Sequence, residues 1–266
     1  DRCQLMEIMG RYRPAILFHA AANKHVPMVE LNPRQAVKTN LLGSLFTARA
    51  ALKTGVERFI LISTDKAVNP ANVMGATKRG AELSIQLLAR KKQTVFAAVR
   101  FGNVLGSAGS VVPIFAQQIA QGGPVTITHP DMTRYFMTIP EAVGLVLQTA
   151  ALAKGGEIFA LDMGEPVSIL DLARRMISLA GLEPEKDIPI QFTGTRPGEK
   201  LYEELCLAEE HTLATGREKI FINSPLPLSP EVESLLETLE AGINQMDLNQ
   251  LLELLHQLVP TFDHRR

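Results

Sequence analysis

Short apolar runs alternate along this chain with longer segments of helical periodicity. The apolar runs predict strands at residues 15–18, 58–63, 94–101, 125–128, 157–162 and 188–193. Helices are predicted between them, at residues 33–53, 76–91, 111–121, 140–153 and 168–181. Because strands separated by helices form parallel sheets with right-handed crossovers, the pattern predicts an α/β fold.

The end of the chain has a different pattern. Apolar residues recur at i, i+3, i+4 and i+7 in two stretches, Val232, Leu235, Leu236 and Leu239, and then Leu248, Leu251, Leu252 and Leu255. This spacing gives each of two helices one apolar stripe. We predict a helical hairpin over residues 226–266 whose stripes pack on the core.

The composition is that of an ordinary globular protein, with 46% apolar and 21% charged residues among 266. The formal net charge of -1 gives no reason to expect nucleic acid or an acidic membrane surface as a partner. Two cysteines, Cys3 and Cys206, do not make a disulfide framework, so a reducing, cytoplasmic compartment is expected. No apolar run reaches the roughly 18 residues of a membrane-spanning helix. No His or Cys pair has the spacing of metal ligands, so no metal site is expected.

The densest group of chemically active side chains follows a predicted strand. Residues 63–78 read STDKAVNPANVMGATK, which places a hydroxyl, an acid and an amine side by side at residues 64–66. A helix that begins near Gly75 carries Lys78. Strand ends in open α/β sheets bind ligands, and these three groups suit proton transfer on a polyol. The alternative interpretation is a polar loop with a helix cap.

Six stretches carry a resemblance to a known family. They are HAAA at 19–22, KHVP at 24–27, STDKAVNPANVMGATKR at 63–79, VRFGNVLGS at 99–107, THPDMTRYFMTIPEAV at 128–143 and RPGEKLYEEL at 196–205. With them the chain resembles the extended short-chain dehydrogenase/reductases, and within these the CapD-like nucleotide-sugar 4,6-dehydratases of bacterial polysaccharide biosynthesis. In two places it departs from the family. Met74 stands where the family usually has tyrosine, as in the membrane-tethered branch, and the GxGxxG turn is absent.

The resemblance implies a Rossmann-like, doubly wound parallel sheet that lacks its first strands, with a smaller C-terminal substrate lobe. The NAD-binding part would comprise residues 1–105 and 140–164, and the nucleotide-sugar-binding lobe residues 106–139 and 165–225. The chain would be a truncated catalytic domain of a longer, homo-oligomeric protein, tethered to the membrane by an upstream region with this domain in the cytoplasm. Without the Gly-rich turn, the isolated chain is expected to bind NAD poorly.

The resemblance also implies a reaction. NAD, or NADP, would take a hydride from C4 of a UDP-sugar, namely UDP-N-acetylglucosamine, and return it to C6 after water is eliminated. Thr64 would hydrogen-bond the C4 oxygen, and Asp65 would protonate the departing C6 hydroxyl. Lys66 would take the C5 proton, provided that burial or the neighbouring cation Lys78 lowers its pKa. A plain salt bridge between Lys66 and Asp65 is the alternative.

Methionine cannot titrate, so Met74 leaves the proton of the C4 hydroxyl without the usual family acceptor. Asp65 acting through Thr64, or a water molecule, are the candidate routes. Lys78 lies four residues after Met74 on the same helix face and would keep its family role at the cofactor ribose.

Further ligand contacts would come from separate segments. The resemblance places the cofactor beside His19, Ala20, Ala21, Asn40, Ser63, Lys78 and Arg100. It places the UDP-sugar beside Lys24, His25, Asn103, Arg134, Arg196 and Glu199. Arginine forks match phosphate oxygens, so Arg134 and Arg196 are expected at the diphosphate, with Glu199 at a ribose hydroxyl. His25 can equally be an ordinary loop histidine.

Two other functions stay open. A 4- or 5-epimerase would use the same cofactor, but it does not need the Asp65–Lys66 pair and usually keeps the tyrosine. A non-catalytic nucleotide-sugar-binding module would fit the absent Gly-rich turn. Residues 64–66 together with Met74 favour dehydration.

Overall fold

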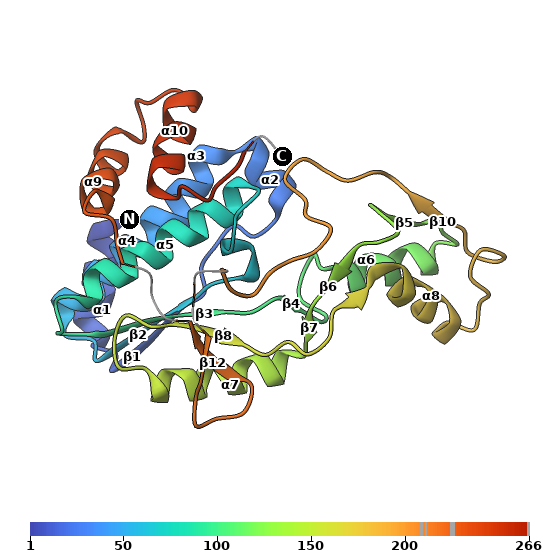
Figure 1. The fold of residues 1–266 in the computed structure, drawn as a ribbon, viewed down its shortest axis with the longest axis horizontal. Helices are drawn as coiled ribbons and strands as arrows, with labels where there is room; N and C mark the ends of the chain where they lie inside the picture. Colours follow the sequence, from blue (N-terminus) through green and yellow to red (C-terminus); the bar gives the residue numbers. More distant parts are fainter. Residues whose placement is uncertain (208–209, 211, 224–226, 265–266) are drawn as a thin grey trace.

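A six-stranded sheet forms the centre of the protein (Figure 1). The computed structural model describes residues 1–207, 210, 212–223 and 227–264. In spatial order the strands are β1 (Ile16–His19), β2 (Arg58–Ile62), β3 (Val95–Arg100), β8 (Ile158–Leu161), β12 (Ile220–Asn223) and β11 (Thr212–Ala214). The first four run parallel, and β12 and β11 continue the sheet antiparallel. The predicted α/β fold with a parallel, Rossmann-like sheet is confirmed.

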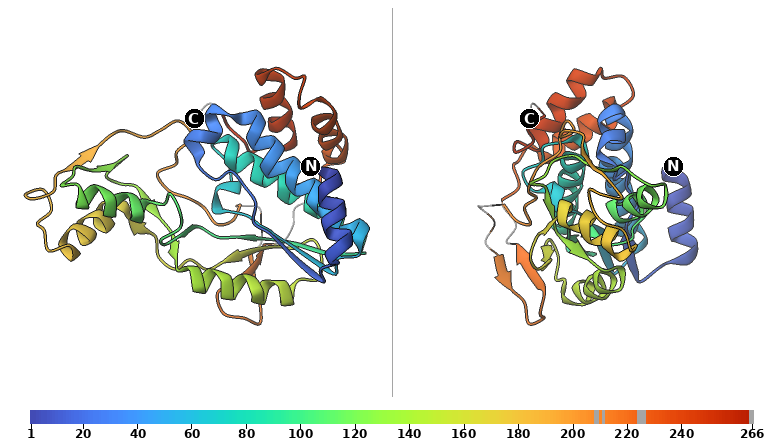
Figure 2. Two further views of the ribbon diagram at one scale, coloured as in Figure 1. Left: turned by 180° about the vertical axis from the view of Figure 1, so that it is seen from behind. Right: turned by 90° about the vertical axis from the view of Figure 1, so that its right-hand side faces the viewer.

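Helices cover both faces of this sheet (Figures 1 and 2). One face carries α1 (Arg2–Tyr12), α2 (Val26–Leu31), α3 (Pro33–Ala36), the π-helical stretch η1 (Val37–Leu42), α4 (Gly43–Thr54) and α5 (Val73–Ala89). The opposite face carries α7 (Ile139–Leu152). The single helix predicted at residues 33–53 is therefore three successive helical segments. Helix α5 begins at Val73, earlier than predicted, because the Asn72 side chain accepts a hydrogen bond from the Gly75 amide and caps the helix.

The central strands β2, β3 and β8 supply both cores, because successive side chains in a strand point to opposite faces. Phe59 and Phe96 of β2 and β3 are fully buried on the side of α4 and α5. Ile60 and Phe159, from β2 and β8, are equally buried but belong to the cluster under α7. This double burial explains why the strands read as continuous apolar runs in the sequence.

The predicted C-terminal hairpin is present as α9 (Val232–Gly242) and α10 (Leu248–Leu258). Its stripe residues Leu236, Leu239, Leu251 and Leu255 are buried, and both helices pack against α5. Helix α5 is thus enclosed between the sheet and the hairpin. Several of its polar side chains are buried, Lys78 among them, whose amine faces the end of β2.

A smaller lobe extends from the sheet (Figure 1). It consists of α6 (Val111–Ala120), α8 (Ile169–Leu179), β5 (Val125–Ile127) and β10 (Ile190–Phe192). The strands predicted at residues 125–128 and 188–193 pair with each other here, not with the main sheet, because α6 and α8 share an apolar core with them. Two short strand pairs, β4 (Asn103–Val104) with β7 (Phe136–Met137) and β6 (Thr133–Arg134) with β9 (Val167–Ser168), join the lobe to the sheet. The exact domain boundaries stay a prediction.

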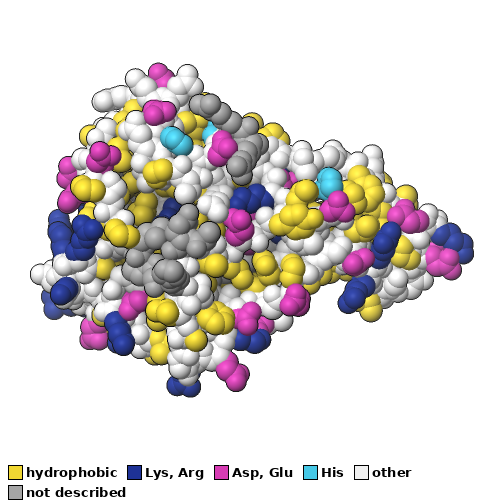
Figure 3. All heavy atoms as spheres, viewed as in Figure 1, with side chains coloured by type: hydrophobic (Ala, Val, Ile, Leu, Met, Phe, Trp, Pro, Cys, Tyr) yellow, Lys and Arg dark blue, Asp and Glu magenta, His cyan; other side chains and the backbone are white. Residues whose placement is uncertain are grey.

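Strands β11 and β12 were not predicted. The apolar run Ile220–Ile222 is too short to stand out in the sequence, and its pairing with β8 decides its conformation. In the described part of the chain, no helix is long and apolar enough to cross a membrane. Basic and acidic side chains are interspersed over the face shown in Figure 3, in keeping with the balanced charge.

Candidate active site

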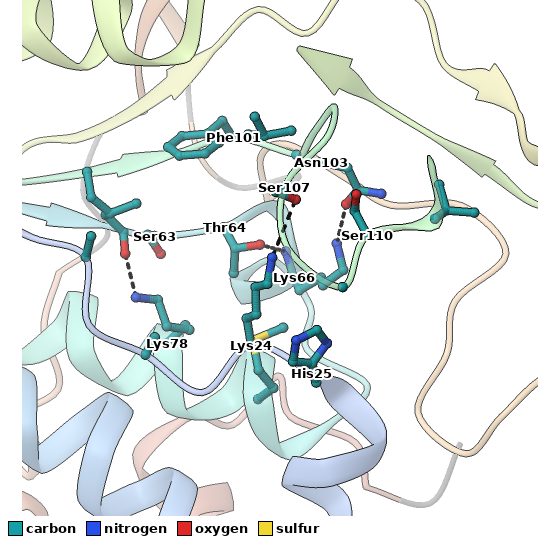
Figure 4. A pocket seen from close by; sticks show the side chains of 18 residues that line it. Lys24, His25, Ser63, Thr64, Lys66, Lys78, Phe101, Asn103, Ser107 and Ser110 are labelled. Carbon is teal, nitrogen blue, oxygen red and sulfur yellow. Dashed lines mark hydrogen bonds between the residues drawn. The ribbon is translucent and has the colours of Figure 1, made fainter. Parts of the chain in front are cut away.

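A pocket of about 430 Å³ opens at the carboxyl ends of β1, β2 and β3, beside α5 (Figure 4). It lies at the strand edge where ligands bind in open α/β sheets. Its walls come from three segments and α5: Ala20, Ala22, Lys24, His25, Ile62, Ser63, Thr64, Lys66, Met74, Lys78, Phe101, Gly102, Asn103, Val104, Ser107, Gly109, Ser110 and Val111. Nine of the residues predicted from the sequence lie together in this wall: Ala20, Lys24, His25, Ser63, Thr64, Lys66, Met74, Lys78 and Asn103.

The turn after β2 presents the central groups. The amide of Asp65 donates to the carbonyl of Phe101, 3.1 Å away, and residues Asp65–Ala67 form a single 3₁₀ turn, η2. Helix α5 packs directly on this turn at Gly75. A Cβ atom on Gly75 would lie 2.1 Å from the carbonyl oxygen of Lys66, so only glycine permits this approach. The glycine therefore brings Met74 and Lys78 to the same pocket as the turn.

Asp65 is fully buried and does not line the pocket. Its Oδ1 accepts hydrogen bonds from Thr64 Oγ1 at 2.8 Å, from the Lys66 amide at 2.9 Å and from Lys66 Nζ at 3.0 Å. Its Oδ2 is also buried and has no hydrogen-bond partner among the described residues. Asp65 thus reaches the pocket through Thr64 and Lys66, which both line it.

Lys66 is held by acidic and polar oxygens. Its Nζ lies 3.0 Å from Asp65 Oδ1, 3.3 Å from Asn103 Oδ1 and 3.8 Å from Glu203 Oε1. Burial acts to lower the pKa of Lys66, but the charges of Asp65 and Glu203 outweigh it, and the net pKa is raised. The salt bridge weighed as the alternative is therefore present. The sequence predicted a lowered pKa for Lys66. This prediction is wrong, because the charges of Asp65 and Glu203 outweigh the effect of burial.

Lys78 has the opposite electrostatic environment. Its Nζ donates to the carbonyl of Ile62, and burial lowers its pKa to about 8, although Glu82 acts to raise it. Met74 lines the same wall one turn earlier. The pocket therefore contains one lysine whose pKa is raised and one whose pKa is lowered.

The segment after β1 contributes small side chains and a fixed loop. Ala20 and Ala22 lie in the pocket wall, whereas Ala21 does not. Asn40 bonds the amide and carbonyl of Asn23, at 2.7 and 3.0 Å, and so fixes this loop.

Two further residues of this region have defined partners. His19 is buried with Nε2 3.0 Å from Ser44 Oγ, and burial lowers its pKa to about 4, with Lys78 adding to the effect. Neither His19 nor Asn40 lines the pocket, so the structure places both behind its wall.

Lys24 and His25 close the pocket against the loop that follows β4. Lys24 Nζ lies 3.5 Å from Ser107 Oγ. A Cβ atom on Gly109 would lie 2.4 Å from a ring carbon of His25, and the backbone φ of Gly109 is 69°. A larger residue at this position would have to displace the His25 ring, and the positive φ also favours glycine.

Arg100 is not in the pocket, contrary to its expected place beside the cofactor. Its side chain is fully buried and pairs with Glu82 and Glu210, with closest N–O distances of 2.7 Å to each. Glu82 also accepts from Arg79 at 2.8 Å and from Ser63 Oγ at 2.6 Å. Desolvation acts to raise the pKa of Glu82, but these cations lower it to about 2. Arg100 belongs to a buried ion cluster that fixes Ser63 from behind.

The three expected diphosphate and ribose contacts also lie outside the pocket wall. Arg134 is buried, and its guanidinium donates to the carbonyls of Thr133, Lys200 and Leu201 at 2.7 to 3.1 Å. Arg196 is exposed, and Glu199 Oε2 accepts from its amide at 3.2 Å. The structure therefore uses Arg134 to hold the chain near residue 200.

Sequence reasoning missed several wall residues and two buried acids. Phe101, Gly102, Ser107 and Ser110 follow β3 in or beside the VRFGNVLGS stretch, which was a signal for this wall. Glu203 lies in the RPGEKLYEEL stretch but was not singled out, because its partner Lys66 is distant in the sequence. Glu82 was missed for the same reason, since its partner Arg100 comes from β3. In the described part of the chain no cluster of acidic, His and Cys residues could hold a metal ion.

A Rossmann-like sheet with a polar pocket at its strand ends and a lysine-bearing helix beside it defines an extended short-chain dehydrogenase/reductase. The sequence matches the profile of the family described as "Polysaccharide biosynthesis protein" over residues 1–225, and the chain belongs to this family.

Two curated relatives support this assignment. Over 210 residues the chain is 62% identical to the "Probable polysaccharide biosynthesis protein EpsC" of Bacillus subtilis. The matched region covers 79% of this chain and 35% of that protein. Over 256 residues it is 52% identical to the "Capsular polysaccharide biosynthesis protein CapD" of Staphylococcus aureus, with 96% and 42% covered. The chain thus spans less than half the length of these relatives.

Solved structures show the same fold. The X-ray structure of Pen from Bacillus thuringiensis superposes with a TM-score of 0.79 at 37% identity, covering 86% of this chain and 71% of that chain. DesIV from Streptomyces venezuelae, a dTDP-glucose 4,6-dehydratase solved with NAD bound, superposes with a TM-score of 0.70 at 20% identity, covering 77% and 68%. At that identity, the DesIV comparison supports the fold alone.

Proposed function

We propose that this chain is the catalytic part of an NAD-dependent nucleotide-sugar 4,6-dehydratase that acts on UDP-N-acetylglucosamine. The observation that carries the proposal is the hydrogen-bonded series Thr64–Asp65–Lys66 at the pocket, beside Met74 and Lys78. A 4-epimerase has no leaving hydroxyl and so needs no acid to protonate one.

The pocket residues fit the nicotinamide end of the cofactor. Ala20 and Ala22 leave room for a flat ring near the backbone, and Ser63 and Lys78 offer polar groups at the same wall. In this proposal Lys78 binds the cofactor ribose. NAD, when bound, supplies the redox chemistry, as an acceptor and later donor of hydride.

Thr64 offers the route for the proton of the C4 hydroxyl. Its hydroxyl lines the pocket and already donates to Asp65 Oδ1 at 2.8 Å. A sugar hydroxyl that donates to Thr64 Oγ1 can pass its proton on, since Thr64 releases its own to the carboxylate. This relay replaces the tyrosine whose position Met74 occupies.

Lys66 enters the reaction as an ammonium, because its pKa is raised. Once Asp65 has taken the proton of the C4 hydroxyl through Thr64, its charge no longer holds the proton of Lys66, and burial then favours loss of that proton to solvent. The neutral amine can take the C5 proton. The ammonium formed in this way can donate a proton to the oxygen of the C6 hydroxyl, which leaves as water, a role first expected of Asp65.

The UDP-sugar is proposed to lie along the loop after β4. Asn103 accepts from Lys66 at 3.3 Å and marks the sugar end, and Lys24 offers a cation at the mouth of the pocket. The side chain of Arg196 is exposed, and Glu199 bonds only its backbone amide, so we retain Arg196 as a proposed diphosphate contact.

The test is turnover of UDP-N-acetylglucosamine in deuterated water by the longest polypeptide that contains this chain. A 4-keto-6-deoxy product with deuterium at C5 is expected. Asp65→Asn and Lys66→Met should each lower the rate by roughly 10²–10⁴-fold. The control Lys91→Met changes an exposed lysine beyond α5 and should leave the rate unchanged. A 4-epimer formed without loss of water would contradict the proposal.

A further inference from the structure

The segment that follows β10 returns from the lobe to the sheet and lies against the active-site turn (Figure 1). We call residues 196–207 the return segment. Its carbonyls at Lys200 and Leu201 accept from Arg134, and its Gly198 carbonyl accepts from Asn72 at 2.9 Å. A Cβ on Gly198 would lie 2.8 Å from the Asn72 Cβ. The return segment is therefore anchored by hydrogen bonds to Arg134 and Asn72, and it packs closely against Asn72.

This anchoring places one acidic side chain beside Lys66. Glu203 is 8% exposed, and its Oε1 lies 3.8 Å from Lys66 Nζ and 3.9 Å from Arg134 Nη2. It does not line the pocket, so a substrate would not contact it. The neighbouring Glu204 is exposed and bonds Asn69 and Lys200 at the surface. Of these two adjacent acids, only Glu203 faces the active-site lysine.

We propose that Glu203 is a positioning residue for Lys66: with Asp65 it forms a pair of acidic groups that hold the Lys66 ammonium between them at the pocket. The proposed role in catalysis rests on the proposed dehydratase function, but the geometry of the pair does not. Lys66 Nζ lies 3.0 Å from Asp65 Oδ1 and 3.8 Å from Glu203 Oε1.

The charges around the pair agree with this role. Lys66 is faced by Asp65 from its own turn, by Glu203 from the return segment and by Arg134 from β6. Burial raises the pKa of Glu203, and the charge of Asp65 adds to this effect. The cations Lys66, Arg134 and Lys200 act to lower the pKa of Glu203, but its net pKa is raised. Glu203 can therefore retain a proton more readily than an exposed acid, which would weaken its hold on Lys66 at low pH.

The test measures the titration of Lys66 in the folded chain without any turnover. The chain is labelled with trace acetic anhydride across a series of pH values, and acetylation of each lysine is quantified by peptide mass spectrometry. In the wild type, Lys66 should titrate above the ordinary lysine value of 10.5. Glu203→Gln should lower the Lys66 midpoint by about one pH unit, because an opposite charge at this distance shifts a pKa by roughly that much or more.

Glu204→Gln is the matched control, since it removes the adjacent but exposed carboxylate, and it should leave the Lys66 midpoint unchanged. Glu203→Asp keeps the charge and should restore part of the shift. If Glu203→Gln does not fold, Glu203→Asp alone must lower the midpoint by a smaller amount.

Equal Lys66 midpoints in the wild type, Glu203→Gln and Glu204→Gln would overturn the proposal. So would a wild-type Lys66 that titrates at or below 10.5. Absence of dehydratase activity would contradict the proposed function but leave this titration result intact, so the two failures are distinguishable.

Discussion

Glu82→Gln is the sharpest probe of the buried ion cluster beneath the active site. The Glu82 carboxylate accepts from Arg79, from two nitrogens of Arg100 and from Ser63. The substitution removes the charge but keeps the shape, so Arg79 and Arg100 lose a fully buried counter-ion. Removing one partner of a buried ion pair destabilises proteins by about 3–5 kcal/mol, because the remaining charge stays out of water.

The pKa of Glu82 leads to a similar magnitude. A carboxyl whose pKa falls from 4.5 to about 2 contributes about 3 kcal/mol of stability at neutral pH. The sign follows from proton binding. Between pH 4.5 and 2 the unfolded chain binds a proton at Glu82 that the folded chain does not bind, so this contribution is lost as the pH falls through that window. The Glu82→Gln variant lacks this contribution to stability at every pH.

Guanidinium unfolding of the two proteins between pH 7 and pH 3 measures both effects. The free-energy difference should be about 3 kcal/mol or more at pH 7 and should shrink towards pH 3. Glu183→Gln is the control, since Glu183 pairs with Lys186 at 2.8 Å on the exposed surface, and its loss should cost no more than about 1 kcal/mol. The reasoning about the buried cluster is refuted if Glu82→Gln lowers the free energy of unfolding no more than Glu183→Gln does. It is also refuted if the destabilisation by Glu82→Gln does not change between pH 7 and pH 3.

Two further predictions concern the packing and the second lysine of the pocket. Gly75→Ala should lower the free energy of unfolding by about 1–3 kcal/mol, since its Cβ would meet the Lys66 carbonyl at 2.1 Å. Gly144→Ala, in a helix with nothing within 4 Å, should instead stabilise by up to about 1 kcal/mol, and equal effects of the two would contradict this packing. The Lys78 pKa of about 8 lies below 10.5, so stability should rise by about 3 kcal/mol relative to Lys78→Met as the pH increases across that window. Parallel stability curves for the two proteins would refute the lowered pKa.

Much of the candidate site could be predicted from the sequence because its pieces are local. An apolar strand followed directly by Thr64, Asp65 and Lys66 places these residues at a strand end, whatever the rest of the chain does. The helix that carries Met74 and Lys78 begins a few residues later, so both are brought to the same edge. Residue identity and strand-end position therefore predicted these five groups correctly as neighbours, although Asp65 lies behind the wall rather than in it.

The proton state of these groups could not be predicted, because it depends on residues far away in the chain. Burial of Lys78 between α5 and the end of β2 lowers its pKa, and Glu203, supplied by the return segment, helps to raise that of Lys66. The same limit applies to Arg100 and Arg134, whose residue type matched a ligand-binding role while their buried partners show a structural one.

The sequence by itself thus determined the α/β alternation, the C-terminal hairpin and the set of reactive residues after β2. Each of these follows from periodicity or from spacing within one element and its neighbouring turn. Only the tertiary structure decided which arginines bond to groups inside the protein, and which lysine has a raised pKa and which a lowered one. The physical reason is that desolvation and charge act through space, so a pKa is set by whichever segments the fold brings within a few ångströms of the group.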